Sequence, residues 1–286
     1  MRLTVVGGGA REVEAARYLA QLGHVVHTVG PHQGASPDIW RRVSAVIGPV
    51  LGTDSGGRAL FRPDPDGPLP IEPSWLDQLP AGTPWLLGRC GPWLREALAA
   101  RGLPLRTYGS DDAFVQLNAV PTAEGAISEA ARASGRTAWG SRATVVGCGR
   151  CGLALVRALH AQGAHVRAVA RDAAARAAAR AAGAQAHGWE ELDLALGSAD
   201  WVFNTVPAPV LGAEQLAATD ARVVVVDIAS SPGGTDFGAA ERLGRSAHLV
   251  GGIPDRYPVT AGRILAETAL DILDRYGDGG NGVANL

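Results

Sequence analysis

A glycine turn between a strand-like and a helix-like segment constrains this chain more than any other feature. Residues 143–146 are apolar, and residues 153–159 have the composition of a helix. Between them stand Gly147, Gly149 and Gly152 in a Gly-x-Gly-x-x-Gly pattern. In dinucleotide-binding folds the first glycine permits the tight turn, the second admits the pyrophosphate, and the third lets the helix pack on the strand. The sequence therefore predicts a nucleotide cofactor at this turn.

The same turn predicts further cofactor contacts. Because a helix attracts anions at its amino end, Arg150 and Cys151 are expected beside the phosphates with the three glycines. The next apolar run, residues 165–170, ends in Arg171 and Asp172. Enzymes that use NAD usually place an acid there to bind the ribose, whereas an arginine suits the 2′-phosphate of NADP. We predict NADP; the alternative is that Asp172 binds the ribose of NAD and Arg171 merely begins the next helix.

Composition excludes several classes of protein. The chain has 286 residues, enough for two domains, and a formal net charge of −2, which argues against a nucleic-acid surface or an electrostatic membrane anchor. No apolar segment is long enough to cross a membrane, so we expect a cytoplasmic protein. The three cysteines are too few for a disulfide framework, and the seven histidines lack metal-ligand spacing, so no metal site is predicted.

The chain contains no lysine, so all 26 of its Lys+Arg residues are arginine. Schiff-base formation and acid–base catalysis by lysine are therefore impossible within this chain. Among oxidoreductases, this argues against an amino-acid or hydroxy-acid dehydrogenase that relies on a catalytic lysine.

Strand-like and helix-like segments alternate through both halves, which predicts an α/β fold with two doubly wound Rossmann-like domains joined by bridging helices. The first half begins with a weaker glycine turn, Gly7-Gly8-Gly9, in which Glu12 replaces the third glycine. We expect this turn to serve another purpose. The predicted boundaries are residues 1–117 for a substrate or partner domain, 118–136 for a bridging helix, 137–257 for the NAD(P)-binding domain, and 258–286 for a C-terminal helix and tail.

Ligands of parallel sheets bind beyond the carboxyl ends of the strands. Two predicted strands of the second domain, residues 201–203 and 223–226, are followed by small and polar residues that we expect beside the cofactor. These are Asn204, Thr205, Val206, Pro207, Asp227 and Ala229. In the first domain, the loop of residues 52–57 offers hydroxyl groups. Each loop, taken alone, is equally compatible with ordinary turn chemistry.

Six strings resemble the family of dipicolinate synthase A subunits, in order along the whole chain. The glycine turn is generic, but the strings around Asn118 and Asp227 are specific. The strings span residues 6–14, 118–127, 147–152, 204–207, 227–237 and 260–265. The resemblance implies an enzyme that uses NAD(P) to oxidise a dihydrodipicolinate-type ring to pyridine-2,6-dicarboxylate. It also implies that the partner is a flavoprotein-like B subunit, with a role in making the dipicolinate store of bacterial spores.

A ring with two carboxylates needs arginine forks, hydroxyl groups or amides around it. We hypothesise that the substrate contacts Thr53, Ser55, Asn118 and Thr122, with Arg256 or Arg263 paired to a carboxylate. Glu124 is the candidate general base, and the alternative is that it is only an exposed helix acid. Two other functions stay open: a non-catalytic NADP-binding member of a complex, and an amino- or hydroxy-acid dehydrogenase of related fold.

Overall fold

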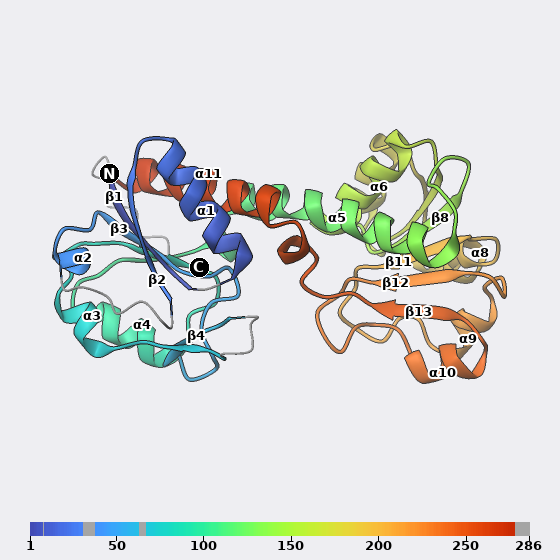
Figure 1. Cartoon of the computed structure of the whole chain (residues 1–286). Helices are drawn as coiled ribbons and strands as arrows, with labels where there is room; N and C mark the ends of the chain where they lie inside the picture. The colour runs from blue at the N-terminus through green and yellow to red at the C-terminus, as the bar shows by residue number, and fades with distance from the viewer. Residues whose placement is uncertain (8, 31–37, 63–66, 278–286) are drawn as a thin grey trace. The chain divides into compact units, whose positions relative to one another are not determined.

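The computed structural model describes residues 1–7, 9–30, 38–62 and 67–277 of the chain. It divides into two compact units (Figure 1): unit 1 comprises Met1–Leu117 and Asp255–Leu286, and unit 2 comprises Asn118–Pro254. Each unit contains one main parallel sheet, so the predicted α/β class with two Rossmann-like domains is confirmed. The C-terminal helix belongs to unit 1. Gly8 of the first glycine turn and residues 278–286 of the predicted tail lie outside the described residues.

Unit 1 is built on a five-stranded parallel sheet with the order β2-β1-β3-β6-β7. Short apolar runs form these strands because parallel strands are buried on both faces. Their bounds are β1 (Arg2–Val6), β2 (Val25–Val29), β3 (Ala45–Ile47), β6 (Trp85–Leu87) and β7 (Leu105–Thr107). A two-stranded antiparallel hairpin, β4 (Ala59–Leu60) with β5 (Leu69–Pro70), accompanies the sheet.

The helices of unit 1 pack on both faces of this sheet. They are α1 (Ala10–Gln21), α2 (Asp38–Arg41), α3 (Pro73–Asp77), α4 (Pro92–Ala99) and α11 (Pro258–Gly277), with the 3₁₀ turn η1 (Tyr108–Ser110). On one face, Leu3 and Val5 of β1 share a core with Leu19 of α1 and Leu265 of α11. The close packing of α1 and α11 depends on Gly262, where an added Cβ would lie 2.7 Å from the Arg11 carbonyl oxygen.

Unit 2 contains a six-stranded parallel sheet with the order β10-β9-β8-β11-β12-β13. Its strands are β8 (Arg142–Val146), β9 (His165–Val169), β10 (Gln185–His187), β11 (Trp201–Asn204), β12 (Val224–Asp227) and β13 (Ser246–Leu249). The helices are α6 (Arg150–Ala161), α7 (Ala173–Ala181), α8 (Leu192–Leu196), α9 (Ala213–Ala217) and α10 (Phe237–Arg242), with the turn η2 (Trp189–Glu191). The turn η3 (Ile253–Arg256) begins in unit 2 and ends in unit 1. The strand order reverses between β8 and β11, the position at which doubly wound sheets bind ligands.

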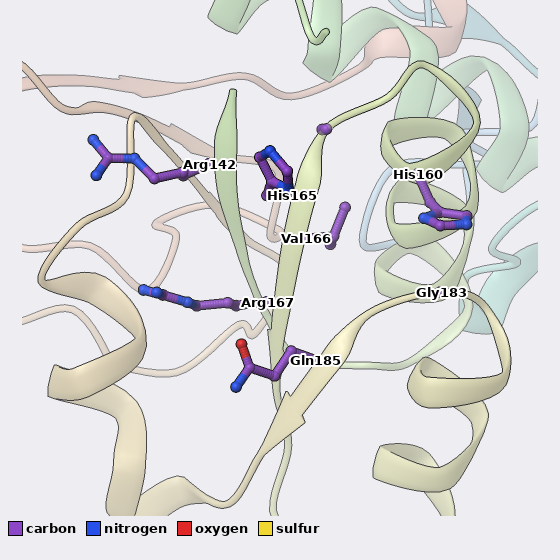
Figure 2. A pocket seen from close by; sticks show the side chains of 8 residues that line it. Arg142, His160, His165, Val166, Arg167, Gly183 and Gln185 are labelled. Atoms are coloured by element: carbon purple, nitrogen blue, oxygen red, sulfur yellow. The ribbon is translucent and has the colours of Figure 1, made fainter. Parts of the chain in front are cut away.

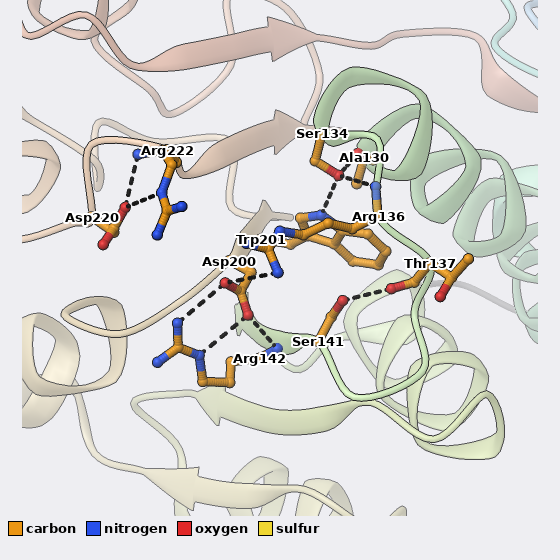
Figure 3. A network of polar contacts seen from close by, with 10 residues as sticks. All are labelled: Ala130, Ser134, Arg136, Thr137, Ser141, Arg142, Asp200, Trp201, Asp220 and Arg222. Carbon is orange, nitrogen blue, oxygen red and sulfur yellow. Dashed lines mark hydrogen bonds and ion pairs between the residues drawn. The ribbon is translucent and has the colours of Figure 1, made fainter.

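Helix α5 (Asp112–Ser134) enters unit 2 and is fixed there by polar contacts (Figure 3). The indole Nε1 of Trp201 donates a hydrogen bond of 2.9 Å to the hydroxyl of Ser134, at the last turn of α5. Beyond the helix, Asp200 accepts hydrogen bonds from the backbone and the guanidinium of Arg142. Pro121 lies inside α5, which is a single helix rather than one restarted at the proline.

Candidate functional site

The glycine turn after β8 has the geometry of a nucleotide cradle. Gly147 has a φ of +92°, and an added Cβ would lie 2.4 Å from the Thr205 hydroxyl oxygen. At Gly152 the Cβ would lie 2.0 Å from the Gly147 carbonyl oxygen. Around Gly149, by contrast, nothing lies within 4 Å of the added Cβ. The outer glycines are thus required by packing, whereas the middle one leaves open space where a pyrophosphate fits.

The amino end of α6 faces this open space. Gly149 is its N-cap and provides no side chain to cap the free N–H groups, which therefore suit a phosphate. Arg150 is exposed and Cys151 is half-buried in the first turn. Burial raises the pKa of the Cys148 thiol to about 11 and also raises the pKa of Cys151, so both stay neutral at pH 7. No group of three His, Cys, Asp or Glu side chains among the described residues is arranged to hold a metal ion.

Arg171 and Asp172 follow β9 and have different surroundings. The guanidinium carbon of Arg171 lies 4.7 Å from the centroid of the Trp189 ring, and the side chain is exposed. The carboxylate of Asp172 accepts a hydrogen bond of 2.8 Å from the backbone N–H of Ala175, so it caps α7. Capping engages the acid in helix stabilisation. Of the two side chains, the exposed guanidinium of Arg171 is thus the one without a capping role at the end of β9, where the ribose is expected.

The ends of β11 and β12 are joined by a buried polar network. Asp227 is fully buried, and its carboxylate accepts hydrogen bonds from the Asn204 amide, the Thr235 hydroxyl and the backbone N–H groups of Ala229 and Gly234. Asn204 also accepts from the N–H of Val206. These bonds hold the loops after both strands in place beside the candidate cofactor site.

Other predicted cofactor residues lie nearer the surface of the same edge. Thr205 is half-buried and donates hydrogen bonds of 3.0 and 3.3 Å to the carbonyl oxygens of Val146 and Gly147. Val206 is half-buried, Pro207 is exposed and Ala229 is buried. The turn after β8 and the loop after β11 are thus in direct contact, as expected for one cofactor site.

The predicted substrate residues are divided between the two units. Thr53 is buried, and its hydroxyl accepts from the Gly91 N–H at 2.8 Å, whereas Ser55 is exposed. On α5, Thr122 donates to the carbonyl oxygen of Asn118, and Glu124 is exposed. Arg256 is exposed in η3, and Arg263 pairs with Glu267 at 2.8 Å. The Thr53 hydroxyl therefore holds the backbone at Gly91 in place, and Arg263 is already paired with the carboxylate of Glu267.

Two buried charged residues of unit 1 were not among the predicted site residues. Arg11 is only 4% exposed; it forms an ion pair of 3.0 Å with Asp255, while its Nε and Nη1 atoms lack hydrogen-bond partners among the described residues. Glu12 is 5% exposed and accepts from the Val50 N–H at 3.2 Å. Burial raises the pKa of Glu12. The sequence signal for Glu12 was its replacement of a glycine, but nothing in the sequence distinguished Arg11 from the other arginines.

A cavity of about 490 Å³ lies at the opposite edge of the unit 2 sheet (Figure 2). Arg142, His165 and Gln185, the first residues of β8, β9 and β10, line it, together with Arg167. Arg142 is paired with Asp200, and Arg167 donates to the Ser198 hydroxyl at 2.7 Å. Because the glycine turn follows the carboxyl end of β8, this cavity is separate from the candidate cofactor site.

Comparisons with known proteins agree with this arrangement. The family model for the N-terminal domain of the dipicolinate synthase A subunit matches residues 2–109. That of the NAD-binding domain of D-isomer-specific 2-hydroxyacid dehydrogenases matches residues 115–232. The dipicolinate synthase A subunit of Bacillus subtilis (strain 168) is 29% identical over 288 residues, 96% of each chain. The chain therefore resembles the dipicolinate synthase A subunits over nearly its whole length.

Two solved structures of dipicolinate synthase A subunits resemble the chain over nearly its full length. The dipicolinate synthase A subunit from Bacillus subtilis has a TM-score of 0.81 at 29% identity and covers 97% of both chains. The one from Bacillus halodurans has a TM-score of 0.79 at 28% identity, covering 95% of this chain and 97% of that one. The chain thus combines a match to the N-terminal domain of the dipicolinate synthase A subunit with an NAD-binding, dehydrogenase-like domain at residues 115–232. No helix in the described part of the chain is long and apolar enough to span a membrane.

Proposed function

We propose that this chain is a dipicolinate synthase A subunit that oxidises a dihydrodipicolinate-type ring to pyridine-2,6-dicarboxylate with NADP, or less favourably with NAD. The observation that carries the proposal is the open cradle at Gly149 in a chain that resembles a dipicolinate synthase A subunit over 96% of its length. The absence of lysine argues against the related lysine-dependent dehydrogenases.

The reaction removes one hydride and one proton from the ring, and the bound nicotinamide would supply the hydride acceptor. In unit 2, Gly147, Gly149 and the amino end of α6 would bind the pyrophosphate, and Arg171 would bind the 2′-phosphate of NADP. The network around Asp227 fixes the loops beside them. Aromatisation of the ring drives the oxidation, so a weak base suffices, and the exposed carboxylate of Glu124 is the candidate that takes the proton.

We further propose that the chain acts in the cytoplasm, has a flavoprotein-like B subunit for its partner, and serves dipicolinate formation in spores. The support for the partner is that the Bacillus subtilis relative is named as the A subunit of the synthase. The support for the metabolic role is the same resemblance.

The test uses the purified chain, with and without a candidate B subunit, and the ring substrate with NADP or NAD. Reduced nicotinamide and pyridine dicarboxylate are followed together by absorbance. We expect reduced nicotinamide and pyridine dicarboxylate to appear together, with NADP the better cofactor. Cofactor binding without turnover, even with the partner present, would instead indicate a non-catalytic nucleotide-binding protein.

The same assay tests the candidate base. Glu124→Gln is expected to lower kcat by roughly tenfold or more, since general bases typically contribute a hundredfold or more and aromatisation reduces the demand here. Glu214→Gln, which alters another exposed helix acid of unit 2, is the matched control. Equal turnover by all three proteins would remove Glu124 from the mechanism and leave it an exposed surface acid.

A further inference from the structure

We propose that a cavity of unit 1 binds the two carboxylates of the ring substrate through Arg89 and Arg95. The cavity, of about 530 Å³, lies where the loops after β3 and β6 and the end of β7 meet the first turn of α5. This is the carboxyl edge of the sheet, where parallel sheets bind ligands, and the volume is typical of small-molecule sites. The identity of the ligand rests on the proposed function; the position of the site does not.

The charge of the cavity favours a dianion. Arg89 and Arg95 both line it, both are exposed, and none of the described residues in its wall is acidic. The guanidinium of Arg95 makes only a long contact of 3.5 Å to the Cys90 carbonyl oxygen. The side chain of Arg89 has no hydrogen bond or ion pair with the described residues. Two guanidinium groups without carboxylate partners match a ligand that carries one carboxylate on each side of a ring.

The backbone that carries Arg89 is held rigidly. Its carbonyl oxygen accepts a hydrogen bond of 2.9 Å from the Thr53 N–H, and the Gly91 N–H donates to the Thr53 hydroxyl. An added Cβ at Gly52 would lie 2.0 Å from the Arg89 carbonyl oxygen, and one at Gly88 would lie 1.7 Å from that of Val50. Two loops far apart in sequence therefore interlock around Arg89. Such preorganisation reduces the entropy lost when a ligand binds.

Aromatic and aliphatic side chains form another part of the wall. Phe114 packs against Tyr108 with ring centroids 5.3 Å apart, and both line the cavity together with Val50. The Tyr108 hydroxyl donates to the carbonyl oxygens of Gly48 and Leu86, and burial raises its pKa well above the usual value, so it remains a neutral phenol. An apolar wall with arginines nearby suits a planar ring with charged substituents.

Calorimetric titration of the full chain with pyridine-2,6-dicarboxylate tests this site, because the product carries the same two carboxylates. Arg89→Gln and Arg95→Gln are each expected to weaken binding by at least tenfold, since each removes a charge-assisted hydrogen bond. Arg42→Gln, an exposed arginine that precedes β3 at the opposite edge of the same sheet, should bind like the parent chain. The binding of pyridine-2-carboxylate, which carries a single carboxylate, should be weakened by only one of these two arginine substitutions.

The outcomes separate this proposal from the proposed function. If the parent chain turns over substrate and binds the product, but both arginine variants bind as tightly as Arg42→Gln, the cavity is not the substrate site and the proposed function still holds. If the parent chain neither turns over the ring nor binds the dicarboxylate, both fail. Unfolding transitions of each variant, measured by circular dichroism, show whether a loss of binding reflects a loss of folded protein, and only a folded variant that fails to bind supports the site.

Discussion

The buried carboxyl group of Glu12 makes the stability of this fold depend on pH. It stands where a third glycine would complete a nucleotide turn, and its carboxyl is instead buried beside Val50. Loss of hydration is the main cause that raises its pKa above 4.5, and the hydrogen bond from Val50 and the charge of Arg11 offset only part of this. The folded chain therefore binds this proton more tightly than the unfolded chain does.

By linkage, the contribution of Glu12 to stability is greatest below pH 4.5 and is lost as the pH rises through the folded-state pKa. Glu12→Gln keeps an oxygen for the Val50 N–H but cannot ionise. We expect its melting temperature to exceed that of the parent chain at pH 8 and the difference to shrink toward pH 4. Glu96→Gln, at an exposed position of α4, is the control. A difference that stays constant between pH 4 and pH 8 would contradict the assignment.

Arg171 is the residue on which cofactor choice depends in this account. Its side chain is exposed after β9 while Asp172 caps α7. A hydrogen bond to a charged group contributes about 1.5–3 kcal/mol. Arg171→Ala should therefore reduce the ratio of NADP to NAD affinity roughly tenfold to a hundredfold. Fluorescence titration with both nucleotides measures the ratio, and Arg180→Ala on α7 controls for loss of charge. An unchanged ratio would favour Asp172 and NAD.

At the scale of elements, the packing of α1 on α11 depends on a single small residue. Gly262→Ala would place a Cβ 2.6 Å from Glu14 Cβ and 2.8 Å from the Ala15 nitrogen, so the two helices must separate. Overpacking of this kind costs about 1–3 kcal/mol. Denaturant unfolding should show that loss. In Gly238→Ala, another helical glycine, the new Cβ meets only ordinary contacts at 3.4 Å or more, and stability should stay equal or rise slightly.

The larger elements were predictable from sequence because their apolar runs and glycines follow simple periods. Strands β8, β11 and β12 and helix α6 lie within a few residues of the predicted segments. The hairpin β4–β5 was not predicted, because strands of two residues have no period to detect. The sequence also offered no reason to single out Arg89 among the arginines, since its exposure in a cavity follows from two interlocked loops.

At the scale of the whole molecule, we propose a different ligand site at each sheet. Unit 2 presents the open glycine cradle at Gly149, and unit 1 presents the cavity with Arg89 and Arg95. The two family models that match the chain follow the same division: the N-terminal model is that of the dipicolinate synthase A subunit, and the second is that of dehydrogenases. We therefore expect nucleotide binding to survive substitutions in the unit 1 cavity.

The most direct test of the central claim is a stoichiometric one. The purified chain is given ring substrate deuterated at its saturated carbons, together with NADP, and the products are quantified by absorbance and mass spectrometry. We predict one reduced nicotinamide for each pyridine-2,6-dicarboxylate formed, with deuterium transferred to the nicotinamide. Dicarboxylate that forms without reduced nicotinamide, or no dicarboxylate even when a B subunit is added, would contradict it.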